Sequence, residues 1–205
     1  MAKAPTSASA KEAAYYLANV PLAGVLPMNV GLTSANESTM VSLLGSPQLP
    51  LTTVDQPARA SARVKALDVT KTLSSHVKVT GIKPAVESLG RAVKAAIDAE
   101  LKAGHDLDSV LGTEGMQNVR YRKPTSGAVS TKISNHAWGT AIDFKIVGHD
   151  APGNTHDVVP RFIAVLIPFL NEEGWFSGVG FSARDTMHFE VADTTMHAWA
   201  KNNKL

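Results

Sequence analysis

Two segments of the chain carry hydrophobic residues at the spacing of a helix. Between Pro84 and Gly104 the apolar positions lie three or four residues apart, at Val86, Leu89, Val93, Ile97 and Leu101. Proline suits the first turn of a helix and glycine its end, so this segment predicts one long amphipathic helix. Residues 158–173 are largely apolar, and we expect a second helix there, kinked at Pro168 and ended by Gly174.

Residues 140–147 alternate between apolar and polar side chains, as a strand with one buried face does. Ile142, Phe144 and Ile146 fall on one face of this predicted strand, while Asp143 falls on the other. The apolar face can therefore fill a core while Asp143 faces a cleft.

The other predicted elements are shorter. We expect strands at 116–122, at 186–192 and near 77–80, and short helices at 11–18, 36–44 and 194–203. Strands and helices do not alternate as regular βαβ units, which favours an α+β fold. The fold class predicted is a mainly antiparallel sheet flanked by helices, with a site for chemistry on one sheet face.

The positions of proline and glycine along the chain suggest one domain with an N-terminal extension. Residues 1–22 are predicted to be a flexible tail or short helix, and residues 23–205 a single domain. Within that domain, residues 23–60 are rich in proline and glycine and form a loop-rich N-terminal arm. The candidate chemistry lies in residues 115–192.

Asp143 raises a question, because burying a carboxylate is costly unless it is paired or bound to metal. His188 shares a strand face with Glu190, and if the two strands are neighbours, Asp143 and His188 converge on one side of the sheet. Gly139 lets the chain turn back, so that His136 reaches the same point. Two imidazoles and one carboxylate, with one position left for water, are the ligand set of a catalytic zinc site. The alternative without metal is an ion pair between Asp143 and Lys145 or Arg122.

Composition and charge exclude several classes of protein. The 205 residues include no cysteine, so disulfides, thiolate nucleophiles and cysteine zinc fingers are excluded, and the formal net charge of +2 does not predict a nucleic-acid partner. The N-terminus lacks the basic start and unbroken apolar run of a secretory signal, and no segment is long and apolar enough to span a membrane. We therefore expect synthesis in the cytoplasm without a classical signal peptide.

Two motifs resemble a known family. "SNHAWGTAID" contains Ser134, His136, Gly139, Ala141 and Asp143 in the pattern Ser-x-His-x-x-Gly-x-Ala-x-Asp, and "DTMHFE" supplies an acidic residue three positions before a histidine. Together they resemble the VanY-like D-alanyl-D-alanine carboxypeptidase and L-alanyl-D-glutamate endopeptidase family of zinc peptidases, whose fold is shared by the hedgehog signalling domain. The resemblance covers residues 115–192 and, more faintly, residues 30–51.

The resemblance implies a function and a role for each motif residue. His136, Asp143 and His188 would hold zinc, and Asp185 would be the general base as zinc-bound water attacks a peptide bond of peptidoglycan. Some family members have glutamate at the Asp185 position, so the shorter aspartate requires the loop at 182–187 to stand closer to the metal. Glu190 is a rival base, because it shares a strand face with His188; its other interpretation is a carboxylate that orients a histidine.

Further candidates surround this predicted centre. The family uses an arginine before the first zinc histidine, and Arg120 and Arg122 both fit, with Arg120 ranked first. Ser134 is a candidate for binding substrate near the metal or for a structural turn. Trp138 and Trp175 are candidates for lining a substrate groove or for packing in the core.

Four questions stay open at the level of sequence. The scissile bond could be L-Ala–D-Glu or a terminal D-Ala, and the expected site of action is the periplasm or cell wall after non-classical delivery. The N-terminal arm could hold a docking partner. The alternative function is a catalytically silent zinc-binding interaction module of the same fold. His149 and His156 flank a loop, and no second metal is predicted there.

Overall fold

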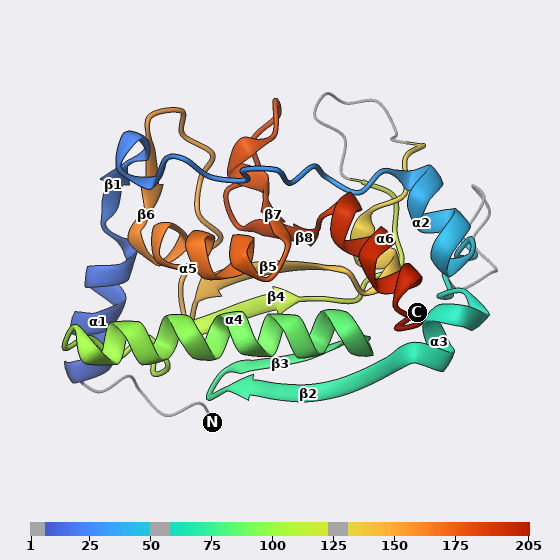
Figure 1. Cartoon of the computed structure of the whole chain (residues 1–205). Helices are drawn as coiled ribbons and strands as arrows, with labels where there is room; N and C mark the ends of the chain where they lie inside the picture. Colours follow the sequence, from blue (N-terminus) through green and yellow to red (C-terminus); the bar gives the residue numbers. More distant parts are fainter. Residues whose placement is uncertain (1–6, 50–57, 123–130) are drawn as a thin grey trace.

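A four-stranded antiparallel sheet lies at the centre of the computed structural model, which describes residues 7–49, 58–122 and 131–205 (Figure 1). Its strands follow the order β4-β5-β8-β7, with bounds β4 Leu111–Gly115, β5 Ala141–Ile146, β8 His188–Val191 and β7 Trp175–Ser177. The predicted strands at 140–147 and 186–192 are thus confirmed as the neighbours β5 and β8. The predicted α+β fold with an antiparallel sheet is also confirmed.

The strand predicted at 116–122 is wrong. The pairing of β4 with β5 becomes irregular after Thr113 and ends at Gly115, so the following residues have no strand partner in the sheet. Instead, this extended segment runs beside residues 132–136, with Tyr121 and Ile133 forming an isolated bridge. The alternation in sequence reflects this local contact, which holds the segment carrying His136.

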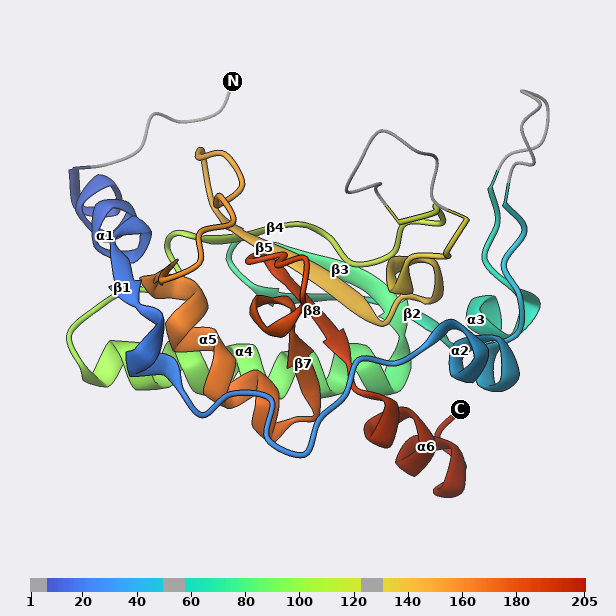
Figure 2. The same ribbon diagram turned by 90° about the horizontal axis from the view of Figure 1, so that it is seen from above.

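A hairpin and two helices cover the sheet. β2 (Asp68–Ser74) and β3 (Val77–Ile82) form the hairpin, and α4 (Lys83–Lys102) packs against both strands and against α5 (Arg161–Glu172). Figures 1 and 2 show α4 and α5 side by side. Both predicted long helices and the strand near 77–80 are confirmed, and Pro168 lies inside α5 without ending it.

The N-terminal helix is part of the core. The helix expected at 11–18 exists as α1 (Ser7–Leu17), which begins four residues earlier. Its Tyr16 is fully buried and donates a hydrogen bond to Glu100 of α4 over 2.9 Å. The short strand β1 (Asn19–Pro21) then pairs with β6 (Val158–Pro160), which leads into α5.

Beyond the 3-10 turn η1 (Leu22–Val25), a coil crosses the edge of the sheet toward α2 (Glu37–Leu44), which Asn36 caps. We call residues 29–37 the strap. Figures 1 and 2 show it passing β7 and β8 on its way to α2. The chain continues through α3 (Ala62–Leu67) and ends in α6 (Asp193–Lys201), at the position predicted for the terminal helix.

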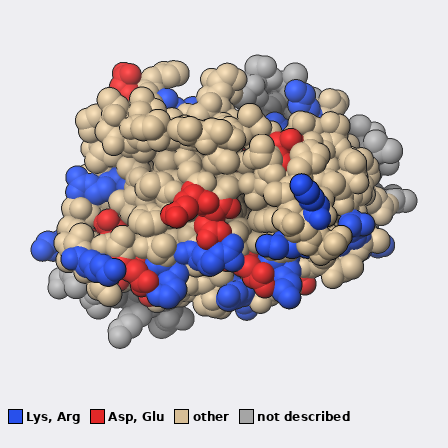
Figure 3. Space-filling model, in the orientation of Figure 1, with Lys and Arg blue, Asp and Glu red and all other residues tan. Residues whose placement is uncertain are grey.

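The surface in Figure 3 carries interleaved charges of both signs. Along α4, basic side chains form ion pairs with acidic neighbours, among them Lys94 with Asp98 at 2.6 Å and Arg91 with Glu173 at 2.6 Å. This face therefore offers no uniformly basic track for a polyanion. None of the helices in the described ranges has the length and hydropathy needed to cross a bilayer.

Candidate metal centre

Three side chains that come from different elements meet at one end of the sheet. His136 lies on the 3-10 turn η2 (Asn135–Trp138), Asp143 on β5 and His188 on β8, where it stands directly opposite Asp143 in the ladder. Asp143 Oδ1 is 3.3 Å from His136 Nε2 and 3.0 Å from His188 Nδ1. Within the described ranges, these three form the one group of histidine and acidic side chains close enough to share a metal ion.

Gly139 explains how His136 reaches this point. Its φ of 63° is left-handed, a conformation that glycine adopts without strain, and its N–H donates to the carbonyl of His136. A Cβ at this position would lie 2.7 Å from the Cα of Gly81 in β3, so only glycine fits there. The chain can thus turn sharply between His136 and Asp143, as the sequence predicted.

Each histidine is held by a partner on the side away from Asp143. His136 donates through Nδ1 to the carbonyl of Met116 over 2.8 Å, and His188 donates through Nε2 to Glu190 over 2.9 Å. The second nitrogen of each ring therefore faces Asp143. This is how proteins orient metal-binding histidines, by fixing the tautomer from behind.

The residues present fit a metal ion. Nε2 of His136 is buried and lies 3.3 Å from Asp143 Oδ1, but without the geometry of a hydrogen bond, so this nitrogen has no hydrogen-bond partner among the described residues. An orphaned buried nitrogen is costly unless something else satisfies it. Two nitrogen donors and a carboxylate oxygen match the ligands of zinc and similar divalent metals.

The electrostatics show how strongly the three groups interact. Burial raises the pKa of Asp143, but its contacts with His136 and then His188 outweigh this, and the net pKa lies well below its usual range. Burial lowers the pKa of His188, but Asp143 and Glu190 together raise it to about 10. The site is therefore built around a fixed negative charge that attracts cations.

Glu190 is locked in place. It is 3 % exposed, and Oε2 accepts from His188 while Oε1 accepts from the hydroxyl of Ser34 in the strap. Burial raises the pKa of Glu190. The contacts with His188 and Ser34 and the charge of Arg122 lower it by more, so the net pKa is below the usual value. Both carboxylate oxygens of Glu190 are thus engaged by protein groups.

A cavity of about 380 Å³ opens onto this cluster. Its walls include the two metal-site residues on β5 and β8, the base candidate and both predicted arginines; the polar and charged lining residues are Ser34, Arg120, Arg122, Ser134, Asn135, Asp143, Ser182, Asp185, His188 and Glu190. Asp185 and the arginines, predicted from widely separated motifs, are thus brought to one space.

Gly178 allows the loop that carries Asp185 to close on the site. Asp185 N–H donates to the carbonyl of Gly178 over 3.0 Å, and a Cβ on Gly178 would lie 2.5 Å from the carbonyl oxygen of Asp185. The next turn returns at once to β8, since the N–H of His188 donates to the carbonyl of Asp185. The loop that carries Asp185 is thus held against the start of β8.

Both arginines lie on the extended segment rather than on a strand. Arg120 donates to the carbonyl of Tyr121 and Arg122 to the carbonyl of Ile133, and both side chains remain half-buried at the cavity wall. Ser134 is 4 % exposed beside them and begins the turn η2. The structure does not separate the two arginines in rank.

The expected role of the tryptophans in a groove does not hold. Trp138 and Trp175 are both fully buried, and neither lines the cavity. The indole of Trp138 donates to the carbonyl of Gly45, and that of Trp175 donates to Ser88 on α4. Their large apolar rings stabilise the core, which is the other interpretation considered for them.

Two further expectations concern neighbouring charges and histidines. Neither partner named in the metal-free alternative forms an ion pair with Asp143 within the described ranges: Lys145 pairs with Glu114 at 2.5 Å, and Arg122 donates to the carbonyl of Ile133. His149 and His156 are exposed and belong to no group of metal-ligating side chains in the described ranges.

No signal in the sequence pointed to the hydrogen bond between His136 and the carbonyl of Met116, since a backbone contact leaves no pattern in the sequence.

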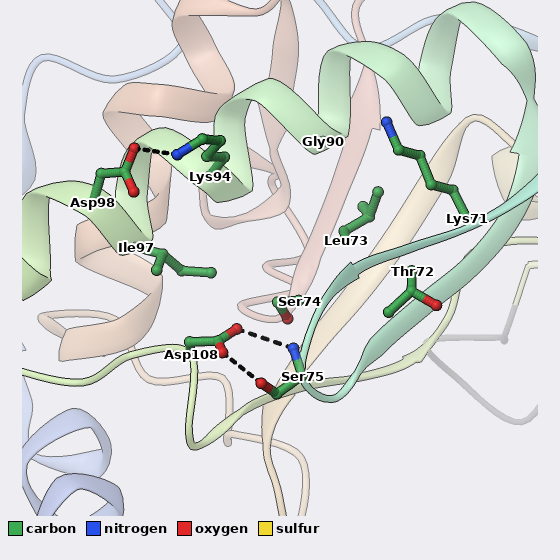
Figure 4. A pocket seen from close by; sticks show the side chains of 10 residues that line it. All are labelled: Lys71, Thr72, Leu73, Ser74, Ser75, Gly90, Lys94, Ile97, Asp98 and Asp108. Atoms are coloured by element: carbon green, nitrogen blue, oxygen red, sulfur yellow. Dashed lines mark hydrogen bonds and ion pairs between the residues drawn. The ribbon is translucent and has the colours of Figure 1, made fainter.

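A second hollow, of about 460 Å³, lies between β2 and α4, away from this cluster (Figure 4). Although larger, it shares no lining residue with the cavity at the metal centre. Among its polar residues, Lys94 pairs with Asp98 and Asp108 accepts from Ser75, and within the described ranges it holds no group of metal-ligating side chains. The smaller cavity is therefore the candidate active site.

Comparison with known proteins supports the same location for the active site. Residues 128–191 match the family model of D-alanyl-D-alanine carboxypeptidase, the family that the two motifs resemble. The matched segment contains His136, Asp143, Asp185 and His188. No curated protein shows a significant match to the chain. The arginines and the strap lie outside the matched segment.

Proposed function

We propose that this protein is a zinc-dependent peptidase that hydrolyses stem peptides of peptidoglycan. The observation that carries the proposal is the convergence of Asp143 with two histidines, each oriented from behind, next to a cavity that a further carboxylate and two arginines line. The match to a carboxypeptidase family supports peptidoglycan peptides as the substrate class and the bacterial cell wall as the place of action.

His136, Asp143 and His188 would hold the metal. When bound there, zinc supplies a Lewis acid that lowers the pKa of a coordinated water to about 7. The fixed tautomers of the two histidines and the ionised state of Asp143 prepare the site for this ion without rearrangement.

Asp185 is the general base in this proposal. It stands half-buried at the cavity wall, where its carboxylate can take a proton from the attacking water and pass it to the leaving amine. Glu190 is less suited to that task, because both of its oxygens already accept hydrogen bonds from Ser34 and His188. These contacts assign Glu190 to holding His188, and Asp185 keeps the role that the family resemblance implies.

Arg120 and Arg122 supply positive charge at the same wall. An arginine facing the scissile carbonyl stabilises the negative charge that develops on its oxygen. An arginine facing a free C-terminus binds its carboxylate in a bidentate manner, as a carboxypeptidase requires. We propose that the pair divides these two tasks, which favours cleavage next to a carboxylate-bearing residue.

The test is mass spectrometry of purified peptidoglycan incubated with the protein, with and without a zinc chelator. We expect new peptide termini that disappear with chelator, and their masses identify the bond as terminal D-Ala or L-Ala–D-Glu. Asp185→Asn keeps the size of the side chain but removes the base, and should lower kcat by about 10²- to 10⁴-fold while metal content stays at the wild-type level.

The outcome that overturns this proposal is an absence of new termini with zinc present. The catalytically silent zinc-binding module would then be favoured, provided that the protein still takes up metal. If Asp185→Asn were fully active and a Glu190→Gln variant were not, the general base would be reassigned to Glu190.

A further inference from the structure

The strap reaches the metal centre from outside the segment that the family model matches. Its Ser34 donates a hydrogen bond to Oε1 of Glu190, whose Oε2 accepts from Nε2 of His188. This forms an unbroken chain of contacts from the N-terminal arm to a metal ligand. The match covers residues 128–191 and therefore accounts for Glu190 but not for Ser34.

Backbone contacts hold Ser34 in register with the strand that carries His188. Ser34 and Ala192 form an antiparallel bridge, and the N–H of Asp193 donates to the carbonyl of Thr33 over 2.9 Å. The strap thus extends the end of β8 by a short antiparallel contact. These contacts fix the backbone position from which the Ser34 hydroxyl reaches Glu190.

The strap also binds the segment that carries His136. The side chain of Asn135 donates to the carbonyl of Ala35 over 3.0 Å, and Glu37 accepts from the N–H of Ile133 over 2.9 Å. Asn135 is 2 % exposed, so its amide is committed to this contact. Within four residues, the strap therefore contacts both ligand-bearing segments, which are about fifty positions apart in the sequence.

The opposite end of the strap is fixed to β7. Asn29 accepts through Oδ1 from the N–H of Ser177 over 2.8 Å and donates through Nδ2 to its carbonyl over 3.0 Å. Its own N–H donates to the side chain of Asn171 over 2.7 Å. These contacts hold the chain across the sheet edge before Ser34 is reached.

We propose that the strap is part of the metal centre and that Ser34 is a positioning residue, which acts through Glu190 to hold the imidazole of His188. Ser34 fixes one carboxylate oxygen so that the other faces Nε2. Glu190 in turn keeps the proton on Nε2 and leaves Nδ1 for the metal. The inference rests on the proposed metal site, but not on which peptide bond is cut.

The experiment compares Zn²⁺ affinity, measured by competition with a chromophoric chelator, in the wild-type full chain and in Ser34→Ala. Loss of a partner behind a metal-binding histidine lowers metal affinity by about 10- to 100-fold, and we expect a fall in this range. Ser34→Thr retains a hydroxyl and should restore most of the affinity. Ser42→Ala, at an exposed serine of α2, is the matched control and should leave it unchanged.

A second readout separates positioning from general destabilisation. Absorption spectra of the Co²⁺-loaded proteins report ligand geometry, and Ser34→Ala should change the d–d bands while Ser42→Ala should not. Unfolding midpoints measured with excess chelator should agree between the two variants within about 2 °C. Equal Zn²⁺ affinity and unchanged Co²⁺ spectra in Ser34→Ala would overturn the inference.

Failure of the two proposals can be told apart. If the wild-type chain binds no Zn²⁺, the proposed function fails together with the inference. If the wild type binds Zn²⁺ and Ser34→Ala binds it equally well, only the role of the strap is wrong. If affinity falls in Ser34→Ala but the Thr variant does not recover it, the hydroxyl contact is not the cause and the inference also fails.

Discussion

At the scale of single residues, the metal centre is defined by which nitrogen of each histidine faces Asp143. His136 turns Nε2 toward Asp143 because its Nδ1 is bound to a carbonyl, whereas His188 turns Nδ1 because its Nε2 is bound to Glu190. The two rings therefore present different atoms to one carboxylate oxygen. A cation at this point satisfies both lone pairs and the charge of Asp143 together.

The raised pKa of His188 predicts that metal binding releases a proton. In the metal-free fold the pKa of His188 is about 10, above the 6.5 of an unperturbed histidine, so the ring is charged at pH 7. That charge stabilises the metal-free fold fully below pH 6.5, and the contribution is lost as the pH rises through 10. Because a metal at Nδ1 displaces this proton, metal affinity should rise with pH between these values.

Titration calorimetry in buffers of different ionisation enthalpy measures this release directly. We expect about one proton released per Zn²⁺ at pH 7 and none in His188→Ala. A binding enthalpy independent of the buffer would show that His188 is neutral before the metal arrives.

At the scale of elements, the site depends on close approaches that only small residues permit. The register of β5 and β8 places Asp143 opposite His188, while Gly178 lets the Asp185 loop fold against the start of β8. Strand pairing thus fixes the ligands, and a loop contact fixes the base. A change in the loop should therefore affect catalysis more than metal binding.

Gly178→Ala tests this separation. The added Cβ would lie 2.5 Å from the carbonyl of Asp185, so the loop must move, and displacement of a catalytic group by about 1 Å can cost 100-fold in rate. We expect a fall of about 10- to 100-fold in kcat with Zn²⁺ affinity changed much less. Gly153→Ala, which has open space for its Cβ, is the control. An unchanged kcat in Gly178→Ala would mean that the loop tolerates the shift.

Much of this arrangement could be predicted from the sequence, because it depends on patterns among residues that are close together in the chain. The alternation around Asp143, the Gly139 turn and the spacing of Asp185 and His188 are all short-range signals, and the strands, ligands and long helices followed from them. The strand expected at 116–122 was wrong, because alternation shows which side chains can be buried but not whether a partner strand is present.

Contacts between segments that lie far apart in the chain could not be predicted from the sequence. Nothing near Ser34 in the sequence points to its contact with Glu190, 156 positions away. The tryptophans illustrate the same limit in reverse. Their place beside the motifs suggested a groove, but their rings fill the core because helix and loop packing elsewhere leaves room for them.

At the scale of the whole molecule, one compact unit holds the metal centre from several sides. The N-terminal helix α1 packs on α5, the strap joins β7 to the metal centre, and β3 supports the Gly139 turn. Because His188 lies 45 positions from Asp143 in the sequence, a bound metal adds a further link between β5 and β8 beyond their backbone pairing. Metal binding should therefore stabilise the entire fold.

Zinc should raise the unfolding temperature by a predictable amount. At a free Zn²⁺ concentration 100 times Kd, linkage contributes about 2.7 kcal/mol, which corresponds to about 5–10 °C for a protein of this size. Differential scanning calorimetry with Zn²⁺ and with excess chelator measures the difference. Asp143→Asn should show no shift, and a similar shift in that variant would place the metal elsewhere.

The central claim is that one metal ion at His136, Asp143 and His188 drives hydrolysis of peptidoglycan peptides. The most direct measurement is the rate of release of new peptide termini from purified peptidoglycan as Zn²⁺ is added stepwise to the metal-free protein. We predict that the rate rises to a plateau at one equivalent and that Asp143→Asn releases none at any concentration. A rate independent of Zn²⁺, or an Asp143→Asn variant that follows the wild-type curve, would contradict the account.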